Sequence, residues 1–547
     1  MAAELSGLNT AAGKKKESPV ILWLLGVFLL AAALRTIAVL TRQMVQFDEA
    51  SYARMAENLL LGHAPWDITH TSTVHLSVLY PIVTASFAVI IRSYVAAGYV
   101  VSVLFGSLLV LPTFMFGKVM WNRRVGLMAA ALVAVLPVMI DKSSTIDGQN
   151  LFAFWLMCAM FFGYRMQFTK RCMCGMLAGT CLGIAYIDDP TALYYLVVLF
   201  GLLVYIGFRQ EVASYANKAA SHFVLMFVLF AIPNIIFLST QVGGFAIQAR
   251  PVDELYAAMH NLRPQTLDWD RQMMRLDSSG NLVLPRMQQG DGLAVMLVKN
   301  PAGVFSAMLR QINFYYIRNV ATLFPAWLLM LIGLGVFKTV WSRREALKYG
   351  YFALMLLPLA TLPLKWPDVR FMMPYMAIFM LWAARGWLSL ESWGVGTVSE
   401  LLGWKHDNPR RKMVVQAALA AVVLVPVAAL ALWSVARTDY PVQYKEAGQW
   451  LKSHGGDGSR IMSRETSTVY YAGATQVLLP YASTTQVLSY GRRQHADFLV
   501  ISRQEVDQLR PELNGLMNPA LAGPGLKMVY RYGAGTGADT IVYRLTG

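Results

Sequence analysis

Two adjacent acidic residues follow the first long apolar segment of the chain. Asp48 and Glu49 come shortly after the run that ends at Leu40. The residues from Tyr52 to Leu60 repeat their apolar side chains at the spacing of an amphipathic helix, and Gly62 suits its C-terminal end. We expect this helix to lie on a bilayer surface with both carboxylates at its N-terminus. Asp48 either caps that helix or acts as a general base at the lipid boundary.

Acidic residues also occur in two short turns between apolar runs: Asp147, Asp188 and Asp189. Asp147 precedes a glycine, where it either caps a helix or orients groups near the first acidic pair. The two aspartates before Pro190 have helix capping as their alternative role. With the first pair, these oxygens offer ligands to a divalent cation such as Mg²⁺ or Mn²⁺, although nothing in the sequence requires a cofactor.

The composition indicates which kind of scaffold must position these residues. Hydrophobic residues make up 56% of the 547 positions and charged residues only 14%, whereas soluble domains carry about 25% charged residues. This excludes an ordinary cytosolic enzyme, a disordered chain and a secreted disulfide scaffold, and it indicates a polytopic membrane protein. The net charge of +16 comes from short cation clusters between apolar runs. We therefore expect membrane lipids, and not nucleic acid, as partners.

A bilayer crossing needs about 20 mostly apolar residues. Runs near that length lie at residues 19–40, 97–117, 125–140, 149–164, 173–187, 191–208, 220–238, 320–340, 348–364, 371–388 and 413–436. The shorter run from Leu76 to Ile91 decides the orientation. If it does not cross, every cation cluster falls on the cytoplasmic side, as the positive-inside rule requires. We predict about eleven spans, with this run as a juxtamembrane or re-entrant helix.

The predicted fold class is thus a polytopic α-helical membrane protein with a small C-terminal external α/β domain. The membrane domain covers residues 1–436 with external loops at 41–96 and 239–319, and the external domain covers 437–547. Polar residues of the second loop, such as Asp270, are candidates for shaping an acceptor site. The expected elements of the tail are helices at 444–451 and 484–494 and strands at 460–463, 498–502, 528–532 and 540–545.

Several short motifs occur in a suggestive order along the chain. They are Asp48-Glu49-Ala-Ser-Tyr52, the segment from His75 to Tyr80, Asn122-Arg123-Arg124, Asp147, the segment from Gly183 to Leu193, and the segment from Arg370 to Pro374. In this the sequence resembles the polyprenyl-phosphate-dependent C-type (GT-C) glycosyltransferases, in the branch with protein O-mannosyltransferases and the lipid A aminoarabinose transferase. The resemblance spans almost the whole chain. Leu76 and Ser77 depart from it where relatives have prolines, and Asp188 and Asp189 where relatives often have a lysine.

The resemblance implies transfer of a single sugar from a polyprenyl-phosphate donor to an external acceptor, which is a lipid, lipopolysaccharide, glycan or protein. It also implies a multi-pass protein of a bacterial inner membrane, with the active site and the C-terminal domain facing the periplasm. Asp48 is then the general base of an inverting reaction, with Glu49 and Asp147 as the other catalytic candidates.

Cations are needed to stabilise the departing phosphate. The candidates are His75, Lys365 and Arg370, since arginine binds phosphate bidentately and lysine acts as a point charge. Anchoring at the membrane interface is the alternative for Lys365 and Arg370. The remaining candidates for the substrate pocket are Tyr52, Tyr80, Asp188 and Asp189.

Two other classes of membrane protein remain as alternatives. A transporter should bury ionisable residues near the bilayer midplane and show inverted repeats, and Arg35 is the only cation well inside a predicted span. A lipid-linked glycan ligase or polymerase would also use an external loop and a polyprenyl carrier. Its donor would be a glycan on pyrophosphate, so the nature of the donor separates the classes.

Overall fold

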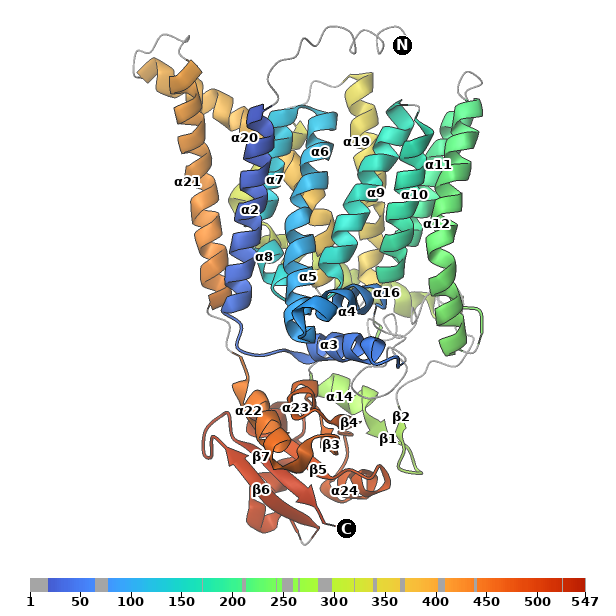
Figure 1. The fold of residues 1–547 in the computed structure, drawn as a ribbon, viewed down its shortest axis with the longest axis vertical. Coiled ribbons are helices and arrows are strands. Elements are labelled where there is room, and N and C mark those ends of the chain that lie inside the picture. The colour runs from blue at the N-terminus through green and yellow to red at the C-terminus, as the bar shows by residue number, and fades with distance from the viewer. Residues whose placement is uncertain are drawn as a thin grey trace.

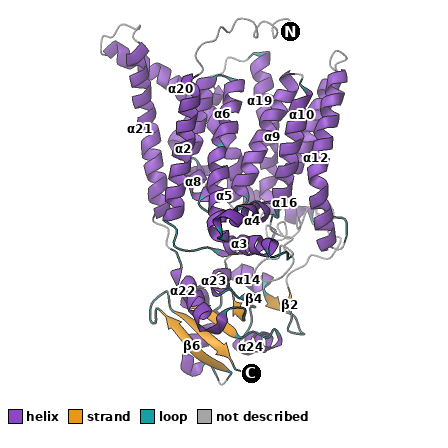
Figure 2. Cartoon of the chain, viewed as in Figure 1, coloured by secondary structure: helices purple, strands orange, loops and turns teal. Residues whose placement is uncertain are grey.

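The computed structural model describes most of the chain. The described residues are 18–63, 77–169, 171–208, 213–242, 244–247, 259–263, 266–283, 298–318, 320–337, 342–364, 369–401, 409–436, 440–523 and 525–546. Within them, a bundle of helices occupies one part of the molecule and a small β-sheet lies beyond one end of that bundle (Figure 1). Helices make up the bundle and also surround the sheet (Figure 2). The fold is therefore mostly helical, as predicted.

The first half of the bundle contains α2 (Ser18–Leu40), α3 (Phe47–Leu60), α4 (Leu79–Ile91), α5 (Tyr94–Leu108), α6 (Val110–Met120), α7 (Arg123–Val135), α8 (Pro137–Ser143), α9 (Gln149–Thr169), α10 (Cys172–Asp188), α11 (Ala192–Gly207) and α12 (Ala213–Val242). The second half contains α16 (Pro301–Ile312), the π-helix η2 (Asn313–Arg318), α17 (Val320–Leu323), α18 (Ala326–Phe337), α19 (Arg343–Leu356), the 3₁₀ helices η3 (Leu357–Leu364) and η4 (Val369–Met372), α20 (Met373–Leu401) and α21 (Pro409–Ala436). Glycines allow α18 and α20 to pack closely, since a Cβ on Gly335 or Gly386 would meet the backbone of the other helix.

Four helices in the described part of the chain are long and apolar enough to cross a membrane: Val20–Leu40, Tyr94–Met120, Ser214–Thr240 and Met413–Trp433. The bent pair α7 and α8 makes a fifth if it is counted as one span. Shorter apolar helices, among them α10, α11 and α18, pack against other helices of the same bundle. The total of about eleven spans stays a prediction.

Two helices lie at the end of the bundle that faces the sheet. α3 runs across this end, and α4 packs between α3 and α5 (Figure 1). The segment predicted as a juxtamembrane or re-entrant helix thus forms α4 at this end. Arg92 follows α4 in the left-handed conformation with φ of 59°, and Ser93 caps the start of α5 through the N–H of Ala96. This turn reverses the chain into the bundle.

A sharp break separates α7 from α8, where the axis bends by 58°. Pro137 begins α8, and a proline cannot continue the hydrogen-bond ladder of the preceding helix. The freed carbonyls of Val133 and Ala134 accept hydrogen bonds from Arg35 at 3.1 and 3.0 Å. The Nε of the same fully buried arginine donates to Ser143 Oγ at 3.1 Å. Arg35 therefore holds both sides of the break. This structural role explains the buried arginine without a transport function.

The C-terminal part of the chain forms a five-stranded sheet in the order β4-β3-β5-β7-β6. Its strands are β3 (Arg460–Ser463), β4 (Thr475–Leu478), β5 (Phe498–Ser502), β6 (Leu526–Tyr532) and β7 (Thr540–Leu545). Its helices are α22 (Val442–Leu451), the π-turn η5 (Lys452–Gly456), α23 (Thr466–Ala472), α24 (Thr484–Arg493), α25 (Arg503–Gln508) and the 3₁₀ turns η6 (Pro511–Met517) and η7 (Pro519–Leu521). We call residues 442–545 the sheet unit.

The strands and helices expected in the tail are all present, each within two residues of the predicted bounds. β3, β4 and β5 pair in parallel, and β7 pairs antiparallel with β5 and β6. The sequence pattern did not predict α23 and β4, which form a parallel β3-α23-β4 unit, or α25 and the 3₁₀ turns η6 and η7. All of these elements are short, and a periodic pattern of apolar residues is weak over so few positions. Division of the chain at residue 437 remains our proposal for the domain boundary.

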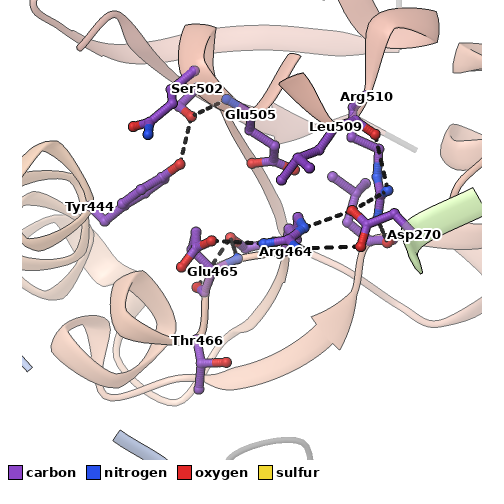
Figure 3. A network of polar contacts seen from close by, with 12 residues as sticks. Asp270, Tyr444, Arg464, Glu465, Thr466, Ser502, Glu505, Leu509 and Arg510 are labelled. Carbon is purple, nitrogen blue, oxygen red and sulfur yellow. Dashed lines mark hydrogen bonds and ion pairs between the residues drawn. The ribbon is translucent and has the colours of Figure 1, made fainter. Parts of the chain in front are cut away.

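The loop between α12 and α16 reaches the sheet unit through α14 (Leu267–Met273) and the hairpin of β1 (Arg275–Leu276) and β2 (Leu282–Val283). Asp270 on α14 is fully buried there. Its carboxylate accepts hydrogen bonds from Arg464 at 2.7 and 3.3 Å and from Arg510 (Figure 3). Asp270 is thus engaged by two arginines and is unavailable to an acceptor, which corrects its assignment from the sequence. Pattern alone does not reveal a buried partner that lies about 200 positions away.

Glu505 on α25 lies in the same polar cluster (Figure 3). Both carboxyl oxygens are buried and lack a hydrogen-bond partner among the residues that the structure describes. Burial raises the pKa of Glu505 to about 8, and nearby Glu465 and Asp270 act in the same direction while Arg464 and Arg510 oppose it. With Glu505 protonated, two arginines balance two carboxylates. A charged Glu505 would add a surplus negative charge to a site that water does not reach.

We expect Glu505→Gln to stabilise the sheet unit increasingly as pH rises. The folded state keeps the Glu505 proton up to a pH of about 8, whereas the unfolded chain loses it near the ordinary glutamate pKa of about 4.3. The proton therefore favours the folded state of the wild type fully at acidic pH, and this stabilisation is lost as pH rises towards 8. Over that interval the variant should gain about 1 kcal/mol per pH unit over the wild type, with no further gain above pH 8.

Thermal unfolding between pH 5 and 9 measures this difference. Asp507→Asn is the matched control because Asp507 is an exposed carboxylate on the same helix. A Glu505→Gln variant that shows the same pH dependence as the wild type would contradict the assignment.

Candidate active site

The side chain of Glu49 joins three segments at the sheet-facing end of the bundle. Its Oε1 accepts hydrogen bonds from Arg42 at 2.7 Å and from the backbone N–H of Ile146 at 3.1 Å. Its Oε2 accepts the N–H of Gln46 at 2.7 Å. Burial raises the pKa of this carboxyl, and Arg42 and the two backbone donors act against that rise. Glu49 therefore links the end of α2, the start of α3 and the turn before α9.

Asp48 lies next to this buried group, at the second position of α3. Gln46 is the N-cap, and Glu49 completes a capping box by accepting the Gln46 N–H. Capping of α3 is thus explained without Asp48, which is only half-buried. On the predicted apolar face of α3, Tyr52, Met55 and Ala56 are buried and Leu60 is exposed, and Gly62 follows with φ of 76°. The chemical role of Asp48 stays a prediction.

Asp147 lies in the turn between α8 and α9, one position after the Ile146 N–H that Glu49 binds. Its carboxylate accepts the N–H of Gln149 at 3.0 Å and the hydroxyl of Thr145 at 2.9 Å. The first of these bonds caps the start of α9, so the capping alternative is correct for one of its oxygens. The carboxylate is also close enough to Glu49 to influence its pKa. The structure therefore brings Asp147 to the α3 site.

The turn after α10 contributes the next pair of carboxylates. Asp188 accepts a hydrogen bond from the hydroxyl of Ser77 and packs against Gly148, where an added Cβ would lie 2.6 Å from its Oδ1. Asp188 thus reaches the same turn as Asp147. Asp189 accepts the N–H of Thr191 at 2.7 Å and so takes part in capping α11. Helix capping was the alternative role given for this residue in the sequence analysis. Ser77, which marks a departure from the resembled family, is the partner of Asp188.

Tyr52 and Tyr80 pack against each other beneath α3. Their rings meet edge to face with centroids 5.2 Å apart. The hydroxyl of Tyr80 is buried, donates to the carbonyl of Gly98 at 2.7 Å and lies 2.7 Å from Ser102 Oγ. Both tyrosines belong to a small apolar cluster that also contains Ile146. Their rings set the distance between α3, α4 and α5.

The side chains of the three candidate phosphate ligands are not among the described parts of the structure. His75 and Lys365 lie outside the described residues, and Arg370 is described only through its backbone in η4. No three His, Cys, Asp or Glu side chains in the described ranges are arranged to hold a metal ion. The neighbouring carboxylates instead bind Arg42, Ser77 and backbone N–H groups.

Arg42 is the residue of this site that the sequence analysis missed. Its side chain is 5% exposed, forms the ion pair with Glu49, and stacks over the rings of Tyr99 and Tyr440 at 5.9 and 5.6 Å. Tyr440 belongs to the connection between α21 and the sheet unit. The sequence offered one signal, since an arginine directly after an apolar run and seven positions before an acidic residue is a candidate ion-pair partner.

We expect Arg42→Ala to destabilise the protein far more than Arg54→Ala. Loss of Arg42 leaves the buried charge of Glu49 without its partner, which typically costs about 3 to 5 kcal/mol. Arg54 pairs with Glu57 on the same helix, but these side chains are 17% and 28% exposed, and such pairs contribute about 0 to 1 kcal/mol. Thermal unfolding in one detergent compares the two variants. Equal losses would show that the Arg42 ion pair does not hold the site together.

No protein-family profile and no curated protein matches the sequence. Among solved structures, the oligosaccharyltransferase of Archaeoglobus fulgidus in its apo form aligns with a TM-score of 0.60 at 14% identity, over 97% of this chain and 75% of its own. The archaeal oligosaccharyltransferase AglB in complex with an inhibitory peptide and a dolichol-phosphate aligns with a TM-score of 0.56 at 13% identity, over 95% and 74%.

A bacterial structure matches over nearly its entire length. ArnT from Cupriavidus metallidurans bound to undecaprenyl phosphate aligns with a TM-score of 0.54 at 11% identity, over 95% of this chain and 98% of its own. At these identities the likeness concerns the fold. In that respect the motif-based resemblance is confirmed, because the chain has the GT-C fold, the fold of membrane-embedded glycosyltransferases.

Proposed function

We propose that this protein is a membrane glycosyltransferase that moves a single sugar from a polyprenyl-phosphate donor to an acceptor on the external face, with inversion. The observation that carries the proposal is the convergence of Asp48, Glu49, Asp147 and Asp188 at one end of a GT-C bundle. Two of the matching structures contain a dolichol-phosphate or undecaprenyl phosphate. A donor of this lipid class therefore suits the fold.

In the proposed reaction, an acceptor hydroxyl or amine attacks the anomeric carbon of the donor sugar. Asp48 takes the proton from the acceptor, the new bond forms at the anomeric carbon, and the bond to the phosphate oxygen breaks with departure of the polyprenyl phosphate. Glu49 holds α3 against the Asp147 turn through Arg42 and Ile146. His75, Lys365 and Arg370 are our candidates for stabilising the charge on the departing phosphate.

Transfer of a glycan from a lipid-linked pyrophosphate is the second candidate. The transfer of a whole glycan is favoured by one observation, the similarity to the archaeal oligosaccharyltransferase. Mass spectrometry of lipid that co-purifies with the protein separates the candidates. A polyprenyl monophosphate bearing one sugar supports our proposal, and a glycan on pyrophosphate supports the second candidate.

We expect Asp48→Asn to abolish transfer while leaving the fold intact. The change keeps the size of the side chain and removes the proton acceptor, a loss that typically lowers the rate by about 10² to 10⁴. Glu57→Gln is the matched control, since Glu57 also lies on α3 but pairs with Arg54. Transfer to an acceptor is measured together with thermal unfolding and donor binding. Near-normal turnover of Asp48→Asn would refute its role as base.

The proposed orientation places the sheet unit in the periplasm of a bacterial inner membrane. The start of α7 and the sheet unit lie at opposite ends of the bundle (Figure 1). Cysteines introduced at Arg123 and Ser453, both exposed positions, should therefore react from opposite sides with a membrane-impermeant thiol reagent. Labelling in intact spheroplasts should occur at position 453 only, with the parent chain as control. Reaction of both cysteines in intact spheroplasts would contradict the orientation.

A further inference from the structure

The sheet unit bonds directly to the segment that precedes α3. The hydroxyl of Tyr471 on α23 accepts the backbone N–H of Val45 at 2.8 Å. Lys445 on α22 donates to the carbonyl of Gln43 at 2.9 Å. α23 itself packs alongside α3. Two helices of the sheet unit therefore hold the short connection between α2 and α3.

These bonds act on the residues that set the direction of α3. Val45 is buried, and its neighbour Gln46 is the N-cap of the helix. The Val45 N–H binds Tyr471, whereas the next N–H, that of Gln46, binds Glu49. Two consecutive peptide groups are thus fixed from opposite sides, one by the sheet unit and one by α3. Asp48 follows two positions later, so its location depends on both bonds.

Tyr471 lies near the end of α23, whose start is anchored by an ion pair and whose end is closed by a glycine. At the start of this helix, Arg464 pairs with Asp270 and with Glu465 at 3.0 Å. At its end, Gly473 takes φ of 70°, which a residue with a side chain adopts only with strain. The α12–α16 loop, which carries Asp270, is thereby connected through α23 to the start of α3.

We propose that Tyr471 is a positioning residue for the reaction and that the sheet unit is a required part of the active site. The proposal rests on the assignment of Asp48 as the base, because Tyr471 acts through the backbone of Val45 and touches no reacting atom. Its hydroxyl fixes the first turn of α3 so that Asp48 meets the acceptor in one geometry. Loss of that hydroxyl should slow the chemical step and leave donor binding unchanged.

Tyr471→Phe tests this proposal, and the adjacent Tyr470→Phe is its matched control. Both tyrosines are half-buried on α23, but Tyr470 contacts α3 through its ring, which lies 5.8 Å from the Arg54 guanidinium. A neutral hydrogen bond such as that of the Tyr471 hydroxyl typically changes an equilibrium or rate constant by a factor of about 3 to 10. We expect kcat to fall by about that factor in Tyr471→Phe, with a donor KM within about twofold of the wild type and both constants unchanged in Tyr470→Phe.

Amide hydrogen exchange provides a readout that does not depend on activity. Exchange of residues 43–52 should be faster in Tyr471→Phe than in wild type and Tyr470→Phe, while α24 is unaffected. An unchanged exchange rate in residues 43–52 would overturn the proposed contact. Faster exchange with an unchanged kcat would overturn the positioning role. A wild type without transfer activity would instead refute the proposed function, and exchange would still decide whether Tyr471 orders the start of α3.

Discussion

The ion pair between Arg42 and Glu49 is the interaction on which the candidate site depends. A carboxylate buried at the end of a helical bundle must be compensated, and Glu49 obtains compensation from one guanidinium and two backbone N–H groups. Two of these donors lie in the connection between α2 and α3, and the third lies in the turn before α9. The requirement to satisfy one buried charge therefore brings the end of α2, the start of α3 and the turn of Asp147 to the same point.

A second buried arginine supports the other side of this turn. Arg35 satisfies carbonyls that the break before Pro137 leaves without helical partners, and it also binds Ser143. Ser143 in turn donates to Asn150, whose amide binds the carbonyl of Lys142. Unsatisfied backbone groups within a membrane are costly, so this network fixes the chain from α8 to α9. The Asp147 turn is thus held by Arg35 from within the bundle and by Glu49 from its surface.

The sheet unit contacts the candidate site from outside the helical bundle. Its polar cluster binds the α12–α16 loop through Asp270, and its helices bind the connection between α2 and α3 through Tyr471 and Lys445. The cluster contains three carboxyl groups and two guanidinium groups, and the raised pKa of Glu505 keeps the charges balanced at neutral pH. These contacts connect the sheet unit directly to the residues that precede α3.

The sequence by itself determined the mostly helical fold, the amphipathic helix that carries Asp48, the resemblance to GT-C enzymes, and within the sheet unit the helices α22 and α24 and the strands β3, β5, β6 and β7. These features follow from local periodicity, turn residues and short motifs, which are properties of adjacent positions. Tertiary structure alone decided that Glu49 binds Arg42, that Asp270 binds Arg464 and Arg510, and that Tyr471 reaches Val45. Each of these contacts depends on which polar groups are buried together. A pattern read along one chain does not contain that information, because a buried charge is satisfied by whichever donor the packing of distant segments brings within hydrogen-bonding distance.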